Sequence, residues 1–147
     1  MILALQIKLS EPAAKPVRAH PTDAGLDLKS MQWVDIFPNE MKMVDTGVAV
    51  KIPQGYVGLV FLRSSMGKHG FSLANAVGVI DSDYRGNIKV MLRNTKDEKL
   101  VISKEDRIAQ LVVMPIELPD LVEFEGTDDE WNDSERGSGG FGSTGKQ

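Results

Sequence analysis

The sequence predicts an all-β fold, and three observations lead to this prediction. Apolar residues alternate with polar ones at period two in several segments, two other segments are short continuous apolar runs, and turn-forming residues separate them. No segment keeps helical periodicity over ten residues. Many short strands joined by turns are typical of a β-barrel or a β-sandwich, and 147 residues are enough for one domain.

The predicted strands are of two kinds, buried on one face or buried on both faces. Residues 3–9, 48–52 and 88–92 show the alternation of strands with one buried face. The runs at 56–62 and 108–114 are rich in Val, Leu and Ile, which indicates strands buried on both faces. Residues typical of turns lie at 38–39, 53–55, 94–97 and 119–120.

The only helix that the sequence predicts is short and follows Arg63. Ser64 or Ser65 can cap its first turn, because a serine hydroxyl accepts a hydrogen bond from the free N–H groups there. Gly67 and Gly70 interrupt the segment soon afterwards, so we expect one or two turns.

Composition excludes several classes of protein. The chain has no cysteine, which rules out disulfides and thiolate metal sites and is typical of the reducing cytoplasm, where we expect the protein. Its net charge of −4, from 21 acidic against 17 basic residues, gives no basic field for nucleic acid. No apolar run approaches the ~20 residues of a membrane span, and the first residues lack the basic leader of a signal peptide. We therefore expect neither nucleic acid nor a membrane as partner.

The character of the chain changes after Phe124. Residues 125–147 are charged and rich in Gly and Ser, and their only large apolar side chains are Trp131 and Phe141. Such a composition buries too little apolar surface to order itself. We therefore expect a β-domain over residues 1–124 and a mobile tail over residues 125–147. Its first twelve residues, fully extended, reach roughly 40 Å at ~3.3 Å per residue, far enough to reach across a neighbouring subunit.

The stretch at residues 78–86 is the candidate centre of a functional site. Glycines bracket it, and it reads as a turn between strands that presents Asp81 and Tyr84. An Asp at such a turn commonly bonds its own backbone, and this reading applies to both Asp81 and Asp83 when the segment is taken alone.

Five short motifs in a fixed order resemble those of the trimeric dUTP pyrophosphatases, or dUTPases. They occupy residues 24–28, 63–67, 78–86, 107–111 and 136–145, so the resemblance spans nearly the whole chain. It implies a jelly-roll-like β-barrel that assembles as a homotrimer. It also implies hydrolysis of dUTP to dUMP and pyrophosphate, in sites that several subunits share and that the tail closes.

The resemblance gives the third motif the central roles. Asp81 orients and deprotonates the water that attacks the α-phosphorus, and Asp83 is left as a turn residue. The ring of Tyr84 lies against the deoxyribose and leaves no room for a 2′-hydroxyl. Further expected substrate contacts, at the uracil and along the following strand, are Asn75, Gly78, Val79, Ile80 and Lys89.

The second and fourth motifs offer groups suited to phosphate oxygens. A guanidinium, hydroxyls and backbone N–H groups come from Arg63, Ser64, Ser65 and Gly67. Gln110 interrupts an apolar run, so its amide needs a phosphate, a metal-bound water or a neighbouring strand as partner. Asp27 and Arg107 are expected to support the site. Glu105 stands where the family usually has Gly, so it is open whether that turn is as tight here as in the family.

The fifth motif lies in the tail. Its expected substrate contacts are Arg136, Phe141, Gly142, Ser143 and Thr144, with the hydroxyls on the terminal phosphates and the aromatic ring over the base. Residues 140–146 also match half of a P-loop, but Gln147 stands where that loop needs Ser or Thr. No His/Asp/Glu cluster has the spacing of a metal site, and Mg²⁺ prefers phosphate oxygens and waters. We therefore expect Mg²⁺ to arrive on the triphosphate without a direct protein ligand.

Three other functions stay open at this level. A dCTP deaminase shares this barrel, although the uninterrupted fifth motif argues against it. A nucleotide-sensing regulatory protein would keep the pocket and bind other macromolecules. A purely structural β-trimer would bind no dUTP.

Overall fold

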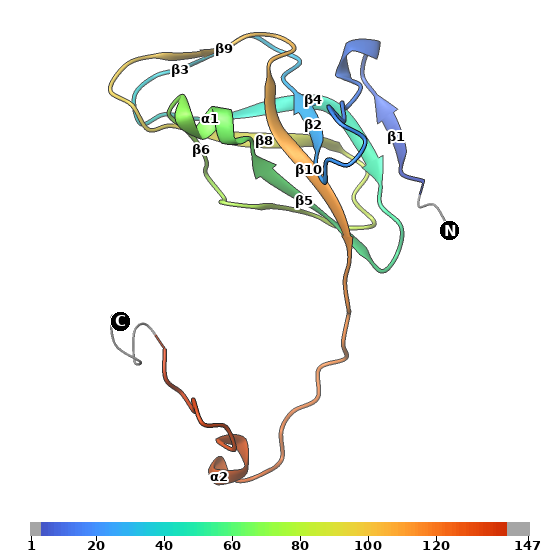
Figure 1. The fold of residues 1–147 in the computed structure, drawn as a ribbon, viewed down its shortest axis with the longest axis vertical. Coiled ribbons are helices and arrows are strands. Elements are labelled where there is room, and N and C mark those ends of the chain that lie inside the picture. Colours follow the sequence, from blue (N-terminus) through green and yellow to red (C-terminus); the bar gives the residue numbers. More distant parts are fainter. Residues whose placement is uncertain (1–3, 141–147) are drawn as a thin grey trace. The chain divides into compact units, whose positions relative to one another are not determined.

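The computed structural model describes residues 4–140, and most of its regular structure is β-strand (Figure 1). One sheet has the order β1-β4-β8-β6, a second has the order β2-β10-β5-β7, and β3 pairs with β9. The first sheet comprises β1 Gln6–Leu9, β4 Met41–Lys51, β8 Asn87–Asn94 and β6 Phe71–Leu73. The other strands are β2 Leu26–Lys29, β10 Arg107–Pro115, β5 Tyr56–Leu62, β7 Gly78–Ile80, β3 Val34–Ile36 and β9 Leu100–Ile102. The all-β prediction is confirmed, although these ladders do not join into one closed barrel within residues 4–140.

A single hydrophobic core draws residues from all three sheets. In β8 the apolar positions Ile88, Val90 and Leu92 are buried while their neighbours are more exposed, as the period-two pattern predicts. Leu28 of β2 and Leu111 of β10 contribute from the second sheet. Packing of alternate side chains from facing sheets therefore holds the strands in register.

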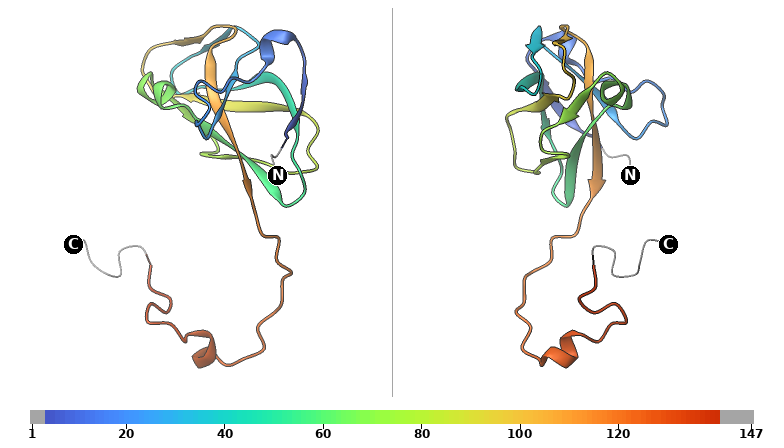
Figure 2. Two further views of the ribbon diagram at one scale, coloured as in Figure 1. Left: turned by 45° about the vertical axis from the view of Figure 1, so that its right-hand side comes forward. Right: turned by 90° about the vertical axis from the view of Figure 1, so that its left-hand side faces the viewer.

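Two strands are less buried than the sequence suggested. Ile7 in β1 is 40% exposed, and Met114 at the end of β10 is 42% exposed. β1 lies at the edge of its sheet, so it packs against one strand only. β10 extends beyond the core at its C-terminal end, where the prediction of a strand buried on both faces was wrong (Figure 2).

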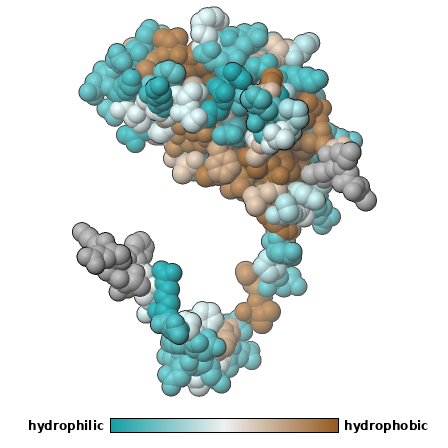
Figure 3. All heavy atoms as spheres, viewed as in Figure 1, coloured by the Kyte–Doolittle hydropathy of each residue, from teal (hydrophilic) through white to brown (hydrophobic). Residues whose placement is uncertain are grey.

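Apolar side chains also remain on the surface (Figure 3). Those at least half exposed among residues 4–117 include Trp33, Met41, Met43, Val79 and Val101. An isolated copy therefore leaves these apolar side chains in contact with solvent.

The chain forms two compact units, Met1–Glu117 and Leu118–Gln147. The expected helix is α1, Ser64–Lys68, in the first unit; the 3₁₀ helix η1, Pro12–Ala14, and α2, Asp128–Trp131, were not predicted. In α2 the Thr127 hydroxyl accepts from the N–H of Glu130, whose carboxylate accepts from the N–H of Thr127. This second bond lowers the pKa of Glu130. No helix among residues 4–140 has the length and apolar character to cross a membrane.

The turn before β10 keeps its tight form although Glu105 stands where the resemblance implies a Gly. Glu105 has φ +71°, in the left-handed region that favours glycine. The N–H of Asp106 donates to the oxygen of Ser103 at 3.1 Å, and the N–H of Glu105 donates to the oxygen of Ser30 at 2.7 Å. These bonds hold the strained residue in place, at a cost of about 1–2 kcal/mol.

We expect Glu105→Gly to raise the free energy of unfolding by about 0.5–1 kcal/mol, because relief of the left-handed strain exceeds the added entropy of the unfolded glycine. Urea unfolding at fixed protein concentration measures the change. Glu105→Ala is the control, since it keeps the β-carbon and therefore the strain. Equal stability of the Gly and Ala variants would contradict this account.

Candidate active site

Residues of the first, second and fourth motifs converge on one cavity of about 340 Å³. β10 lies between β2 and β5, and Gln110 pairs with Asp27 on one side and Phe61 on the other. Arg63 follows β5 and Ser64 begins α1, so both reach the same end of the sheet. The antiparallel register thus brings together residues that lie far apart in the sequence.

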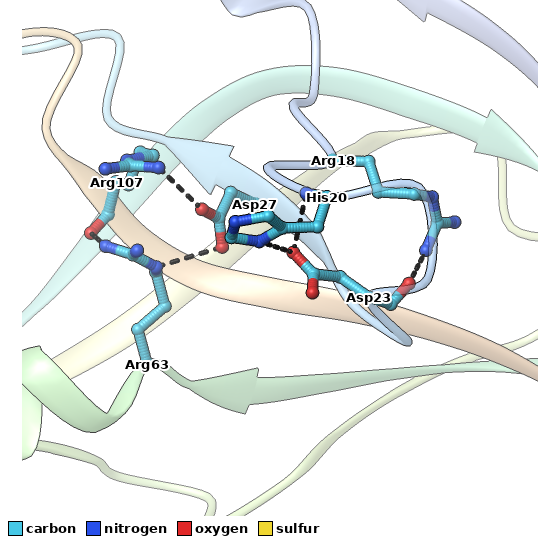
Figure 4. Close-up of polar contacts among 6 residues, drawn as sticks. All are labelled: Arg18, His20, Asp23, Asp27, Arg63 and Arg107. Carbon is cyan, nitrogen blue, oxygen red and sulfur yellow. Dashed lines mark hydrogen bonds and ion pairs between the residues drawn. The ribbon is translucent and has the colours of Figure 1, made fainter.

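The Asp27 carboxylate holds two guanidinium groups (Figure 4). Its Oδ1 lies 2.9 Å from Arg63 Nε, and its Oδ2 lies 3.2 Å from Arg107 Nη1. Arg63 Nη1 also donates to the backbone oxygen of Arg107 at 3.3 Å. Each guanidinium has five N–H donors, and these bonds use only part of them. The cluster therefore carries one net positive charge and presents N–H groups suited to phosphate oxygens.

Two titratable residues that line this cavity, His20 and Asp23, were not among the predicted site residues. The backbone N–H of His20 donates to Asp23 Oδ2 at 2.9 Å, and His20 Nδ1 lies 3.2 Å from the same oxygen. The backbone bond is the main reason why the pKa of Asp23 is lowered. Arg18 Nη1 donates to the backbone oxygen of Asp23. These residues belong to no periodic pattern or motif, so the sequence did not indicate that they line the same cavity as Gln110.

The third motif borders a second cavity of about 290 Å³. Its lining comprises Val79, Ile80, Asp81 and Tyr84 of the motif, Ile88 and Lys89 of β8, and Met43 of β4. The N–H of Tyr84 donates to the oxygen of Asp81 at 3.2 Å, which closes the turn. A β-carbon on Gly86 would lie 2.5 Å from Tyr84 Oη, so a larger residue there would displace the phenol of Tyr84. Within residues 4–140 the carboxylate of Asp81 accepts no hydrogen bond, so it is not used to stabilise its own turn.

The predicted uracil-reading strand lies at a sheet edge. β7 pairs with β5 and is last in its sheet, which leaves one row of backbone groups available. Asn75 lies beside it, since a β-carbon on Gly78 would be 3.8 Å from Asn75 Nδ2. Ala76, with φ +58°, allows the tight return between β6 and β7.

The two cavities lie at opposite ends of β5. Ile80 pairs with Gly58 near one end, and Arg63 follows Leu62 at the other. Six strand residues at ~3.3 Å each separate Arg63 from the position opposite Asp81, which is roughly 20 Å. One chain therefore brings Asp27, Arg63, Ser64 and Gln110 together but does not bring them to Asp81.

The remaining predicted residues are placed as follows. Ser65 and Gly67 are exposed positions of α1. In the second unit, Arg136 Nε donates to the backbone oxygen of Gly139 at 2.8 Å. Phe141, Gly142, Ser143 and Thr144 lie outside the described residues.

An all-β chain with a free carboxylate beside a tyrosine in one cavity, and paired guanidinium groups in another, has the groups of a nucleoside triphosphate hydrolase. The family model for dUTPase matches residues 11–145. The chain belongs to the dUTPase family and hydrolyses dUTP to dUMP.

Relatives and solved structures agree with this assignment. The chain is 46% identical over 140 residues to the deoxyuridine 5′-triphosphate nucleotidohydrolase of Nautilia profundicola, covering 95% of this chain and 96% of that protein. It is 50% identical over 138 residues to the enzyme of that name from Cutibacterium acnes, covering 91% and 87%.

Two phage enzymes share the fold. The dUTPase of Staphylococcus bacteriophage 80alpha, solved with dUpNHpp, has a TM-score of 0.87 and 35% identity, covering 97% of this chain and 99% of that one. The dUTPase of phage phi11 of S. aureus, described with a structural Mg(II) ion, has a TM-score of 0.79 and 31% identity, covering 85% and 99%. The jelly-roll-like dUTPase fold is thus confirmed.

We expect Asp27→Asn to lower kcat/KM for dUTP about tenfold or more, because charge-assisted bonds of ~1.5–3 kcal/mol are lost and the new NH₂ group opposes a guanidinium. Steady-state kinetics measures the loss. The matched control is Asp35→Asn, which removes the same charge from an exposed pair with Lys99 Nζ at 2.9 Å. Similar losses in both variants would contradict a specific role for Asp27.

Proposed function

We propose that Asp81 orients and deprotonates the water that attacks the α-phosphorus of dUTP, while Tyr84 carries the deoxyribose. The observation that supports this most directly is the position of the Asp81 carboxylate, which shares a cavity with Tyr84 and accepts no hydrogen bond from the described part of the chain. A carboxylate without competing donors is able to accept the proton of a water. Lys89 lines the same cavity and adds positive charge next to the phosphates.

The edge of β7 reads the uracil in this proposal. Backbone N–H and C=O groups from Gly78 to Ile80 face no further strand, so they are available to the base. Asn75 adds an amide that both donates and accepts. Cytosine presents a donor where uracil presents an acceptor, so a backbone N–H at that point distinguishes the two.

The phosphate groups are bound by the other cavity. Arg63, Ser64 and Gln110 line it, and Asp27 fixes Arg63 and Arg107 through the ion pairs described above. Ser65 and Gly67 extend the donor set along α1. Orienting the guanidinium groups before substrate binds reduces the reorganisation that catalysis requires.

The residues of this site are compatible with a Mg²⁺ ion that is bound to the triphosphate of the substrate. Residues 4–140 contain no group of three or more His, Asp or Glu side chains placed to hold a metal, and both oxygens of Asp27 already face guanidinium groups. A hard cation such as Mg²⁺ therefore takes phosphate oxygens and waters as ligands. When bound, it neutralises charge on the triphosphate.

A complete site requires more than one copy of the chain. The separation of roughly 20 Å along β5 exceeds the length of three consecutive phosphate groups, so Asp81 and Arg63 of one copy do not serve the same substrate. The exposed apolar side chains of the first unit give a second copy a surface to cover. We propose a homotrimer with sites at its subunit boundaries, each closed by a tail through Arg136 and residues 141–144.

The role of Asp81 predicts that Asp81→Asn lowers kcat at least about a hundredfold, since general bases contribute 10²–10⁴-fold. The Kd for a non-hydrolysable analogue such as dUpNHpp, measured by calorimetry, should change only a few-fold. Asp83→Asn is the control and should keep nearly full activity. Loss of analogue binding together with turnover, or an equal effect of the control, would refute the assigned role.

The shared site predicts complementation between two inactive variants. Asp81→Asn and Arg63→Ala copies are unfolded together in equal amounts, refolded as mixed trimers and assayed for pyrophosphate release from dUTP. At each subunit boundary, the copy that supplies Asp81 is intact at that position with a probability of one half. The copy that supplies Arg63 is intact at that position with the same probability. About one quarter of the sites therefore contain both residues. Activity no higher than that of the separate variants would show that one copy supplies both residues.

A further inference from the structure

A bulge in β4 lies opposite the start of β8. Asp45 pairs with Lys89 and Ala49 pairs with Asn87, so β4 contains two more residues than β8 between these pairs. Gly47, with φ +67°, makes this possible. The side chains of Val44 and Thr46 are fully buried, and Asp45 between them therefore points to the outer face of the sheet.

The Asp45 carboxylate ties the bulge to Asn87. Its Oδ1 accepts from the N–H of Gly47 at 2.7 Å and from Asn87 Nδ2 at 3.2 Å, while Oδ2 lies 3.4 Å from the same amide nitrogen. The backbone oxygen of Asn87 in turn accepts from Tyr84 Oη at 2.9 Å. A chain of hydrogen bonds thus runs from Asp45 through Asn87 to the phenol of Tyr84.

The ring of Tyr84 depends on this chain for its position. The residue is 41% exposed, and the contact of its hydroxyl with Asn87 is the one hydrogen bond that this side chain makes in the described structure. Exclusion of a hydroxyl by contact works only when the excluding ring is held to within about 0.5 Å. A shift of Asn87 would therefore let the ring move away from the sugar.

We propose that Asp45 is a positioning residue for sugar discrimination. It fixes Asn87, and through the Asn87 carbonyl it fixes the phenol of Tyr84 against the 2′ position of the nucleotide. This inference rests on the proposed role of Tyr84, and it adds a residue that lies in another strand and outside the five motifs. Asp45 itself touches no reacting atom.

The test compares kcat/KM for dUTP and for UTP in Asp45→Ala, Asp45→Asn, Asn87→Ala and the Asp45→Ala/Asn87→Ala double variant. Asp45→Ala should lower the dUTP/UTP ratio about three- to tenfold, the effect of one lost hydrogen bond. Asp45→Asn should retain most of the ratio, because its amide oxygen can accept the same two N–H groups. The double variant should lose no more than either single variant, since both remove one interaction.

A stabilising role without positioning would give a different pattern. Asp45→Ala would then lower the melting temperature and leave the dUTP/UTP ratio unchanged, which would overturn the proposal. The proposal would also be overturned if the dUTP/UTP ratio of the double variant fell by the product of the losses in the two single variants. Glu40→Ala is the matched control, because Glu40 Oε2 accepts a backbone N–H from Phe37 at 2.9 Å next to the other end of β4. Its ratio should equal that of the unaltered protein.

Tyr84→Ala separates this inference from the role on which it rests. If Tyr84→Ala leaves the dUTP/UTP ratio intact, Tyr84 does not discriminate the sugar and the role of Asp45 is refuted with it. If Tyr84→Ala collapses the ratio but Asp45→Ala does not, the role of Tyr84 stands and only the role of Asp45 is refuted.

Discussion

The antiparallel register of β5 is the constraint on which the site depends. At one end of β5, Phe61 pairs with Gln110 of β10, whose partner on the other side is Asp27 of β2, and Arg63 follows at the same end. Near the other end, Gly58 pairs with Ile80 of β7, which directly precedes Asp81. An extended strand does not shorten, so the two groups stay roughly 20 Å apart in each copy. The guanidinium cluster and the Asp81 carboxylate are therefore separated within one chain, and the proposed trimer would bring them together from different copies.

Asp27 and Asp81 have the same side chain, but their surroundings suit them to different roles. Both oxygens of Asp27 face guanidinium groups, and its side chain is only 14% exposed, so it orients these two cations. Asp81 is exposed and has no donor within the described chain. The same side chain thus acts as a structural counter-ion in one cavity and is free to act as a base in the other.

The sequence predicts what depends on local pattern and misses what depends on long-range pairing. Period two identified β8, and the glycines at residues 78–86 identified the turn that presents Asp81. The bulge at Asp45 was not predictable, because it exists only relative to Asn87, 42 positions later. His20 was missed because it belongs to no periodic pattern and to none of the motifs. The capping pair of α2, Thr127 and Glu130, was visible in the sequence, yet the acidic composition around it favoured a tail without structure.

The corner at residues 30–32 supports both cavities, although they lie far apart. The N–H of Ser30 donates to the oxygen of Asp106, directly before Arg107, and the N–H of Met31 donates to the oxygen of Asp45. Gln32 Oε1 accepts from the N–H of Asp45 at 3.2 Å. One short segment therefore contacts the backbone directly before Arg107 and the backbone of Asp45, the residue proposed to position Tyr84. Because these bonds form within a single copy, each half of the proposed shared site is already ordered in the isolated chain, which lowers the reorganisation that the proposed assembly would require.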